Sequence, residues 1–300
     1  MKILIVGFGS IGRKHVAAIH DILPDSTIFA LRSLSSAKIE EGIINVFSLR
    51  EIDNIDFAII SNPTALHKET IQILLDLNCP LFIEKPLFHN LEIINIVQCI
   101  MERGILNYIA CNLRFLDSLK YLKSQLPGKR INEVNVYCGS YLPDWRPGSD
   151  FRNVYSSHSD QGGGVHLDLI HELDYVYWLF GNPNRVAKVL RNTSSLEIKS
   201  IDYANYCLEY VNFCASVILN YYRRDAKRSV EIVFDDETWD IDIVQNKITS
   251  GGRVIFESSQ RIKDTYKNQM DYFIDLVRNK NSQSENTVYD ALNVLRICLE

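Results

Sequence analysis

The 300-residue chain has no long hydrophobic run. Its first apolar stretch, from Ile3 to Val6, ends at a glycine and is much shorter than the core of a signal peptide or a membrane span. We therefore expect a soluble protein that makes no membrane association and stays in the cytoplasm.

Cysteine spacings typical of metal or disulfide sites are also missing. The seven cysteines are scattered and odd in number, and none forms a C-x-x-C pair. This pattern predicts neither a disulfide framework nor a zinc site, and we expect no metal cofactor. The net charge of -5 gives no electrostatic reason to bind DNA or RNA, so we expect no nucleic-acid partner.

The composition is that of an ordinary globular protein, with 46% hydrophobic and 23% charged residues. A chain of this length usually fills two hydrophobic cores. The pattern changes near residue 115, which predicts one domain over residues 1–115 and a second over residues 116–300. No Pro- or Gly-rich linker separates them, so we expect the two domains to share an interface.

The first domain alternates short apolar runs with amphipathic stretches, which is typical of a parallel sheet covered by helices. We predict strands at residues 2–6, 27–31, 57–61, 81–83 and 107–110, and helices at 11–22, 65–77 and 90–103. This is an α/β, doubly wound Rossmann pattern with right-handed crossovers.

The second domain has a different pattern. Helices are predicted at residues 116–125, 165–180, 266–278 and 288–299, a strand at 133–140, and alternating apolar and polar residues from 185 to 256. Such alternation indicates an α+β domain with an open, mainly antiparallel sheet.

A glycine-rich segment follows the first strand and begins the first helix. Its residues, Gly7, Phe8, Gly9, Ser10, Ile11 and Gly12, match G-x-G-x-x-G. In this context the glycines allow a tight turn, close approach of the backbone to a pyrophosphate, and close helix packing. The segment therefore predicts a dinucleotide site at a helix N-terminus.

The end of the second strand bears on the choice between NAD and NADP. NAD-binding domains usually carry an acidic residue there, which binds the ribose 2'-hydroxyl. This chain has Arg32 and Ser33 instead, with Ser35 close behind. Because a guanidinium can grip phosphate oxygens, NADP is favoured over NAD. The alternative is that Arg32 is only a solvated surface side chain.

Two further motifs follow predicted strands. Ser61, Asn62, Pro63 and His67 belong to S-N-P-T-A-L-H, and Glu84 and Lys85 belong to E-K-P. With the glycines, these motifs resemble the glucose-fructose oxidoreductase / inositol dehydrogenase (Gfo/Idh/MocA) family. The resemblance implies that the N-P-x-x-x-H segment borders the cofactor, and that Glu84 and Lys85 also belong to the cofactor site. It further implies that Lys85 lies between nicotinamide and substrate. Without the other motifs, Lys85 would be interpreted as an exposed loop lysine.

A second stretch resembles the substrate helix of the same family. Three glycines at 162–164 precede Asp168, His171 and Asp174. The resemblance implies that His171 is the general acid/base and that Asp168 assists it. The family's usual spacing between these two is four residues, whereas here it is three, which still places them on one face of a helix. His166 is interpreted as a structural histidine at the helix start.

Other candidates for substrate binding lie between the two domains' motifs. Arg114 belongs to an N-x-R-F segment, and Trp145, Arg146, Arg152 and Tyr155 belong to a long loop before the predicted helix. Aromatic and guanidinium groups there could stack on a sugar and bind an acidic group. For any one of them, a structural role at the domain interface is an equal alternative.

The resemblance implies reversible hydride transfer between NAD(P) and a secondary alcohol or ketone of a sugar, sugar acid or nucleotide sugar. In the oxidation direction, His171 would take the proton and Lys85 would stabilise the oxyanion. Two alternatives stay open: a redox-assisted lyase or glycosidase that retains its cofactor, and a non-catalytic NAD(P)-binding regulator.

Aromatic residues are frequent in the predicted open sheet, among them Tyr203, Tyr206, Tyr210, Phe213, Tyr221 and Tyr222. A large uncovered apolar face is rare in monomers. We therefore expect a homodimer or homotetramer assembled through this sheet.

Overall fold

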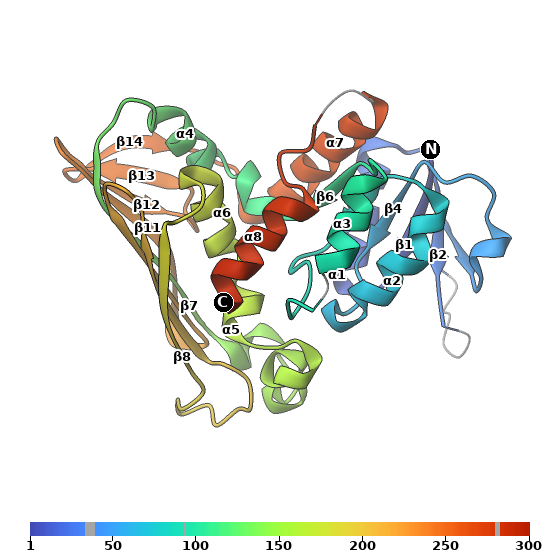
Figure 1. The fold of residues 1–300 in the computed structure, drawn as a ribbon, viewed down its shortest axis with the longest axis horizontal. Helices are drawn as coiled ribbons and strands as arrows, with labels where there is room; N and C mark the ends of the chain where they lie inside the picture. Colours follow the sequence, from blue (N-terminus) through green and yellow to red (C-terminus); the bar gives the residue numbers. More distant parts are fainter. Residues whose placement is uncertain (34–39, 93, 280–282) are drawn as a thin grey trace. The chain divides into compact units, whose positions relative to one another are not determined.

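The computed structural model describes residues 1–33, 40–92, 94–279 and 283–300. These residues form two compact units, one of Met1–Asn112 with Tyr266–Leu299 and one of Leu113–Thr265 with Glu300. Each unit contains one β-sheet, as Figure 1 shows. No helix in the described part of the chain is long and apolar enough to cross a membrane.

The first unit is built on a parallel sheet with the strand order β3-β2-β1-β4-β5-β6. Its strands are β1 (Lys2–Val6), β2 (Thr27–Leu31), β3 (Ile43–Val46), β4 (Phe57–Ile60), β5 (Leu81–Ile83) and β6 (Asn107–Ile109). The order reverses between β1 and β4. Doubly wound sheets bind their ligands outside the carboxyl ends of strands at such a point.

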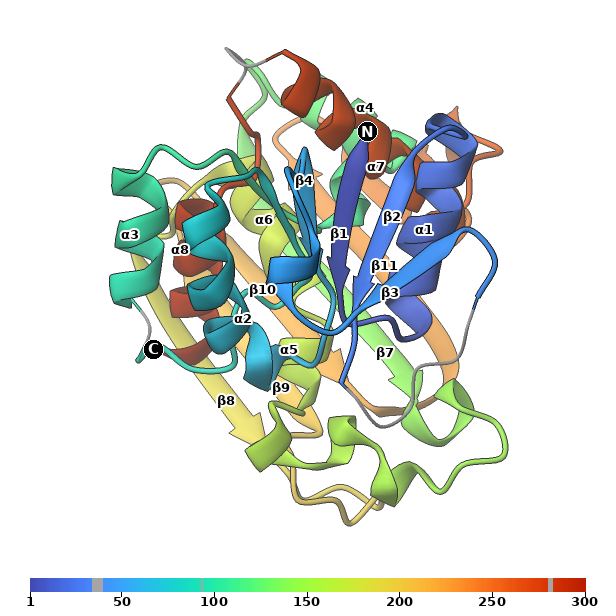
Figure 2. The ribbon, with the colours of Figure 1, turned by 90° about the vertical axis from the view of Figure 1, so that its right-hand side faces the viewer.

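Helices cover both faces of this sheet. In Figure 2, α1 (Ser10–Ile22) lies on one side, and α2 (His67–Leu74) and α3 (Ile94–Glu102) lie on the other. The central strands β1 and β4 are accordingly apolar and almost completely buried. The Rossmann prediction is confirmed, although β3 was not predicted.

The C-terminal helices α7 (Thr265–Arg278) and α8 (Val288–Leu299) belong mainly to the first unit. The segment between them pairs with β6: Asn286 Nδ2 donates to the Ile109 carbonyl at 2.9 Å, and the Val288 N–H donates to Asn107 Oδ1 at 2.7 Å. The expected division at residue 115 is close to the first junction, but residues 266–299 return to the first unit.

The second unit contains a mainly antiparallel sheet with the order β14-β13-β12-β11-β7-β10-β9-β8. Among the described strands of this second sheet, only β7 and β10 pair in parallel. The strands are β7 (Ile131–Tyr141), β8 (Arg185–Arg191), β9 (Tyr203–Glu209), β10 (Cys214–Asn220), β11 (Tyr222–Phe234), β12 (Thr238–Asp242), β13 (Lys247–Ser250) and β14 (Arg253–Glu257). The predicted open sheet is confirmed.

The helices of the second unit, α4 (Asp117–Gln125), α5 (Val165–Asp168) and α6 (His171–Phe180), lie along one face of this sheet in Figure 1. Side chains such as Val136 and Val217 are buried on that face. Their neighbours Tyr137 and Ile218 point to the other face and are half-buried.

The single helix predicted over residues 165–180 is wrong. Leu169, with φ -100° and ψ 29°, ends α5, and α6 begins at His171. The N–H groups of Ile170 and Glu172 bond three residues back, to Leu167 and Leu169, so the turn between the helices is tighter than an α-helix. The argument that one helix face carries both Asp168 and His171 therefore does not hold.

Candidate active site

The glycine-rich segment forms the turn between β1 and α1. Gly7 has φ +94°, and a Cβ there would lie 2.1 Å from the Asn62 nitrogen. A Cβ at Gly12 would lie 2.5 Å from the Gly7 carbonyl oxygen, whereas a Cβ at Gly9 would have no neighbour within 4 Å. The turn is thus closed against the protein at Gly7 and Gly12, and it leaves space at Gly9 for a ligand to approach the backbone.

The first turn of α1 suits an anion. Gly9 is the N-cap residue, no side chain caps the helix, and the first turn contains no acidic residue. Ser10 and Ile11 lie in this turn, whose N–H groups have no partner within the helix. The positive end of the helix dipole adds to the attraction for a phosphate group.

The end of β2 brings Arg32 next to the glycine-rich turn. Its guanidinium carbon lies 5.4 Å from the centre of the Phe8 ring, and that of Arg13 lies 4.8 Å from the same ring. Arg13 is paired with Glu40 at 2.6 Å, whereas no carboxylate among the described residues pairs with Arg32. Ser33 is exposed beside it, and Ser35 lies outside the described residues.

The segment after β4 closes onto the same turn. Ser61 Oγ donates to the Gly7 carbonyl at 2.7 Å, and Asn62 Nδ2 donates to Thr70 Oγ1 at 2.7 Å. Pro63 is exposed at the start of the next turn. The first bond holds the ends of β1 and β4 together at the carboxyl edge of the sheet, and the second connects the segment after β4 to α2.

His67 supports this segment from inside. Its Nδ1 lies 3.0 Å from the Leu87 carbonyl oxygen and its Nε2 lies 3.1 Å from that of Asn62. Burial lowers the pKa of His67, although the carbonyl groups partly oppose this effect. A buried imidazole with these two contacts is placed to connect the two loops.

The E-K-P segment follows β5 at the same edge. Glu84 points inward: its Oε1 lies 2.5 Å from His15 Nε2, and its Oε2 accepts the Lys85 N–H at 3.2 Å. Lys85 itself is half-buried at the strand end. The structure therefore places Lys85 at the predicted edge and gives Glu84 a partner on α1 that the sequence did not reveal.

In the second unit, Asp168 lies between two tyrosines. Tyr155 donates its hydroxyl to Oδ1 at 2.9 Å, and Tyr221 donates to Oδ2 at 2.6 Å. Burial raises the pKa of both phenols, and the charge of Asp168 raises it further. The two hydroxyls therefore stay protonated and hold the carboxylate in place.

Two ion pairs fix the first turn of α6, where His171 is the first residue. Arg114 binds Asp174 through two bonds, Nε to Oδ2 at 2.9 Å and Nη2 to Oδ1 at 2.7 Å. Arg228 Nε lies 2.5 Å from Glu172 Oε1. Arg114 is only 4% exposed, so it is placed to position α6, which differs from its expected role in substrate binding.

His166 is packed inside the glycine-rich turn before α5. A Cβ at Gly164, where φ is +134°, would lie 2.7 Å from the His166 ring. Burial lowers the pKa of His166 to about 4. His166 is therefore a neutral, buried side chain at neutral pH, as its interpretation as a structural histidine requires.

The loop before α5 places aromatic and basic groups near Asp168. The Trp145 ring contacts the Tyr221 ring edge-on at 5.3 Å, and its Nε1 donates to Ser140 at 2.9 Å. The Arg146 guanidinium lies 5.5 Å from the Tyr155 ring centre. The Arg152 guanidinium carbon lies 4.6 Å from the centre of the Phe151 ring.

Comparison with known proteins identifies both halves of the chain. Residues 1–106 match the oxidoreductase family with an NAD-binding Rossmann fold, and residues 120–240 match the Gfo/Idh/MocA C-terminal domain. The chain belongs to the Gfo/Idh/MocA family. Its first unit is thus an NAD-binding Rossmann unit, and the resemblance inferred from the motifs is confirmed.

Similar proteins cover most of the chain at low sequence identity. A myo-inositol 2-dehydrogenase of Thermotoga maritima is 22% identical over 314 residues, covering 93% of this chain and 88% of that protein. The structure of the UDP-N-acetylglucosamine 3-dehydrogenase GnnA from Acidithiobacillus ferrooxidans matches with a TM-score of 0.79 at 18% identity, covering 100% and 95% of the two chains. The WlbA dehydrogenase from Bordetella pertussis, solved with NADH and UDP-GlcNAcA, matches with a TM-score of 0.80 at 18% identity, covering 98% and 93%.

The family motifs account for only some of the arranged side chains. Tyr221, His15 and the Glu172–Arg228 pair were not identified from the sequence. Tyr221 was noted only as one aromatic residue of the sheet, and no local spacing relates it to Asp168. These contacts join residues that are 53 to 69 positions apart, so only the folded chain reveals them.

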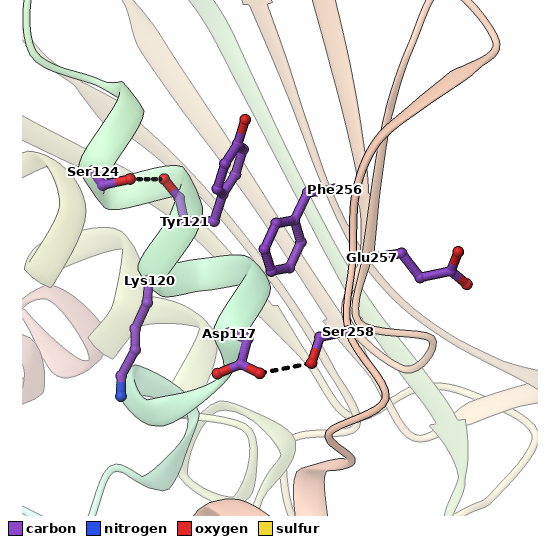
Figure 3. Close-up of a pocket in the computed structure, with 7 residues that line it drawn as sticks. All are labelled: Asp117, Lys120, Tyr121, Ser124, Phe256, Glu257 and Ser258. Carbon is purple, nitrogen blue, oxygen red and sulfur yellow. Dashed lines mark hydrogen bonds between the residues drawn. The ribbon is translucent and has the colours of Figure 1, made fainter.

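A shallow hollow of about 540 Å³ lies between α4 and the end of β14 in the second unit (Figure 3). Tyr121 and Phe256 stack there with ring centres 4.6 Å apart, so their faces cover each other. Ser258 donates to Asp117 at 2.6 Å. None of the predicted site residues lines it. No cluster of three or more metal-ligating side chains occurs in the described residues.

Proposed function

We propose that this enzyme transfers a hydride between a nicotinamide dinucleotide and a secondary alcohol or ketone carbon of a sugar, sugar acid or nucleotide sugar. The bound dinucleotide would supply the hydride acceptor or donor. The observation that carries the proposal is the turn at Gly9, which is open to a ligand at the same sheet edge as Lys85.

In the oxidation direction, His171 would accept the hydroxyl proton while Lys85 stabilises the developing oxyanion. Asp168 would support this pair through its negative charge. The two phenol hydroxyls that bind its oxygens hold the carboxylate in a fixed position. Lys85 belongs to the first unit, and Asp168 and His171 belong to the second. The proposal therefore requires side chains from both units to reach one small molecule.

The loop of the second unit favours an anionic sugar. Trp145 and Tyr155 offer rings for stacking, and Arg146 lies over Tyr155. GnnA is named as a UDP-N-acetylglucosamine 3-dehydrogenase, and the WlbA dehydrogenase was solved with UDP-GlcNAcA. The Thermotoga relative is instead named as a dehydrogenase of myo-inositol, which is uncharged. Arg146→Ala should weaken turnover of nucleotide sugars more than that of inositol.

The test is a screen of inositols, sugar acids and nucleotide sugars with NADP and NAD, followed at the absorbance of the reduced nicotinamide. Lys85→Ala should abolish most turnover without abolishing dinucleotide binding. Product formation with tightly retained cofactor and no net absorbance change would support the redox-assisted lyase or glycosidase instead. Dinucleotide affinity with no turnover of any compound would support the regulator.

We further propose that NADP is preferred over NAD. Arg32 lies beside the glycine-rich turn, and no described carboxylate neutralises it. A 2'-phosphate would be the natural partner of this guanidinium. Arg32→Ala should weaken NADPH binding by about 10-fold or more and leave NADH binding nearly unchanged. Equal losses for both nucleotides would contradict the preference.

We also propose a cytoplasmic homodimer or homotetramer. The seven cysteines form no disulfide, which suits a reducing compartment. The sheet face opposite α4, α5 and α6 carries no helix of the described unit (Figure 1). On this face Tyr222 is exposed and Tyr137 is half-buried. Tyr206 and Tyr221 are instead buried within the unit, so only part of the expected aromatic set is available to a partner.

A further inference from the structure

A chain of buried polar contacts in the first unit joins α1 to the backbone of Lys85. His15 lies on α1 and is 0% exposed. Its Nε2 is 2.5 Å from Glu84 Oε1, and Glu84 Oε2 accepts the Lys85 N–H at 3.2 Å. In its Nε2–H tautomer, His15 donates this hydrogen bond and the carboxylate oxygen accepts it.

The surroundings hold the imidazole in one orientation. The His15 ring meets the Phe82 ring edge-on at 4.9 Å and lies 6.4 Å from the Tyr266 ring. Phe82 is the middle residue of β5 (Leu81–Ile83), and Glu84 and Lys85 follow directly after this strand. The contacts of His15 therefore connect α1 with the strand that carries Lys85.

His15 is also close to the nucleotide turn along the chain. It follows Ser10, the first residue of α1, by little more than one helical turn. The N-terminus of the same helix is the part that we assign to the dinucleotide phosphates. One rigid element thus carries both the proposed phosphate site and the partner of Glu84.

We propose that His15 and Glu84 are positioning residues that fix Lys85 relative to the dinucleotide-binding helix. Glu84 then acts through its contacts inside the protein, in place of the direct cofactor contact expected from the motif. The backbone of Lys85 is held by this pair. Because His15 and the proposed phosphate site both lie on α1, this helix positions the cofactor and the lysine together. This inference rests on the proposed hydride transfer.

The decisive variants keep or remove the donor at His15. His15→Leu fills similar space but leaves Glu84 Oε1 without its partner. His15→Gln retains an amide donor near the position of Nε2 and should rescue the function. Glu84→Gln is a second test, because it replaces one acceptor oxygen by a donor. Asp56→Asn is the matched control, since Asp56 accepts the Lys2 N–H at 2.7 Å at the opposite, amino end of the sheet.

Three measurements are compared: hydrogen exchange in peptides covering residues 84–88, the Kd for NADPH and NADH, and kcat on the best compound of the screen. In His15→Leu and Glu84→Gln we expect exchange near Lys85 to accelerate by about 10-fold and kcat to fall by about 10-fold, while the Kd changes by less than about threefold. His15→Gln should recover most of kcat, and Asp56→Asn should resemble the wild type.

Wild-type exchange near Lys85 together with wild-type kcat in His15→Leu would overturn the inference. A parallel loss of dinucleotide affinity, kcat and Tm in both His15 variants would also overturn it, because that pattern indicates general destabilisation. Failure of the proposed function itself is distinguishable. In that case the wild-type protein would bind neither NADPH nor NADH or would turn over none of the compounds, whichever result the exchange measurement gives.

Discussion

At the scale of single residues, Asp168 depends on the two phenols that hold it. Tyr221 is buried and donates at 2.6 Å, so Tyr221→Phe removes one hydrogen bond without removing the ring. We predict that kcat falls by roughly 10-fold while KM changes little, because the carboxylate loses its fixed orientation. Tyr210→Phe is the control, since the Tyr210 hydroxyl bonds to the Gly181 carbonyl. Equal kinetics in the two variants would contradict the role of Tyr221.

The buried pair of Arg114 and Asp174 makes a prediction about stability. Asp174→Asn leaves the Arg114 guanidinium buried without its charged partner. The free energy of unfolding should fall by about 3–5 kcal/mol, as measured by urea denaturation. Asp225→Asn breaks the exposed pair with Arg223 and should change the free energy of unfolding only slightly, because solvent screens this pair. Similar losses in both variants would show that the burial of Arg114 does not increase the cost of removing its partner.

His166 predicts a pH dependence of stability. Burial lowers its pKa from 6.5 to about 4, so between these values the unfolded chain binds more protons at this group than the folded protein. The free energy of unfolding should therefore decrease as the pH falls from about 6.5 to about 4, by up to about 3 kcal/mol from this residue. His166→Gln does not titrate there and should lose less stability over this range. Denaturation curves at several pH values measure the difference, and parallel losses would refute it.

At the scale of elements, the turn before α5 sets the position of Asp168. A Cβ at Gly163 would lie 2.0 Å from the Tyr155 carbonyl oxygen, and the backbone there cannot easily move because the Gly163 N–H bonds to His158. Gly163→Ala should lower the free energy of unfolding by more than about 2 kcal/mol and reduce kcat. Gly181→Ala, at the end of α6, has φ +78° and open space, so it should cost about 1 kcal/mol. Thermal unfolding and turnover assays give both values.

The elements that the sequence predicted well are those with strong local patterns. The strands β1, β2 and β5 begin and end at the predicted residues, because buried parallel strands are continuous apolar runs. β3 is short and only partly buried, so it lacks that pattern. The break between α5 and α6 was missed because the residues around it, including Leu169 and Ile170, continue the apolar spacing of one helix.

The candidate site follows the same rule. The glycine-rich turn and Lys85 could be located from motifs, since each motif lies at a strand end and needs only nearby residues. The N-x-R-F segment predicts a substrate role for Arg114, but it gives no sign of the buried partner Asp174, which is 60 positions away in the sequence. Partners of that kind are set by the fold, and one sequence carries no local signal for them.

At the scale of the whole molecule, the path of the chain matters for its two units. The chain leaves the first unit after Asn112 and returns to it from Tyr266. On its return, Phe273 on α7 packs against Phe57 and Phe82, with ring centres 5.3 Å away in each case. A fragment ending near residue 115 would therefore expose these buried rings, so the first unit needs both ends of the chain to complete its core.

Assembly through the open sheet face is the prediction for the molecule as a whole. Ile218 lies on that face, opposite Tyr137 on β7 and Asn205 on β9 in the strand register. If this face is buried between subunits, Ile218→Lys places a charge in the interface and should produce a monomer in sedimentation velocity or light scattering. Val254→Lys is the matched control, because Val254 is 50% exposed on the edge strand β14 of the same sheet. A wild-type monomer, or an Ile218→Lys protein that keeps the wild-type mass, would show that this face is not the interface.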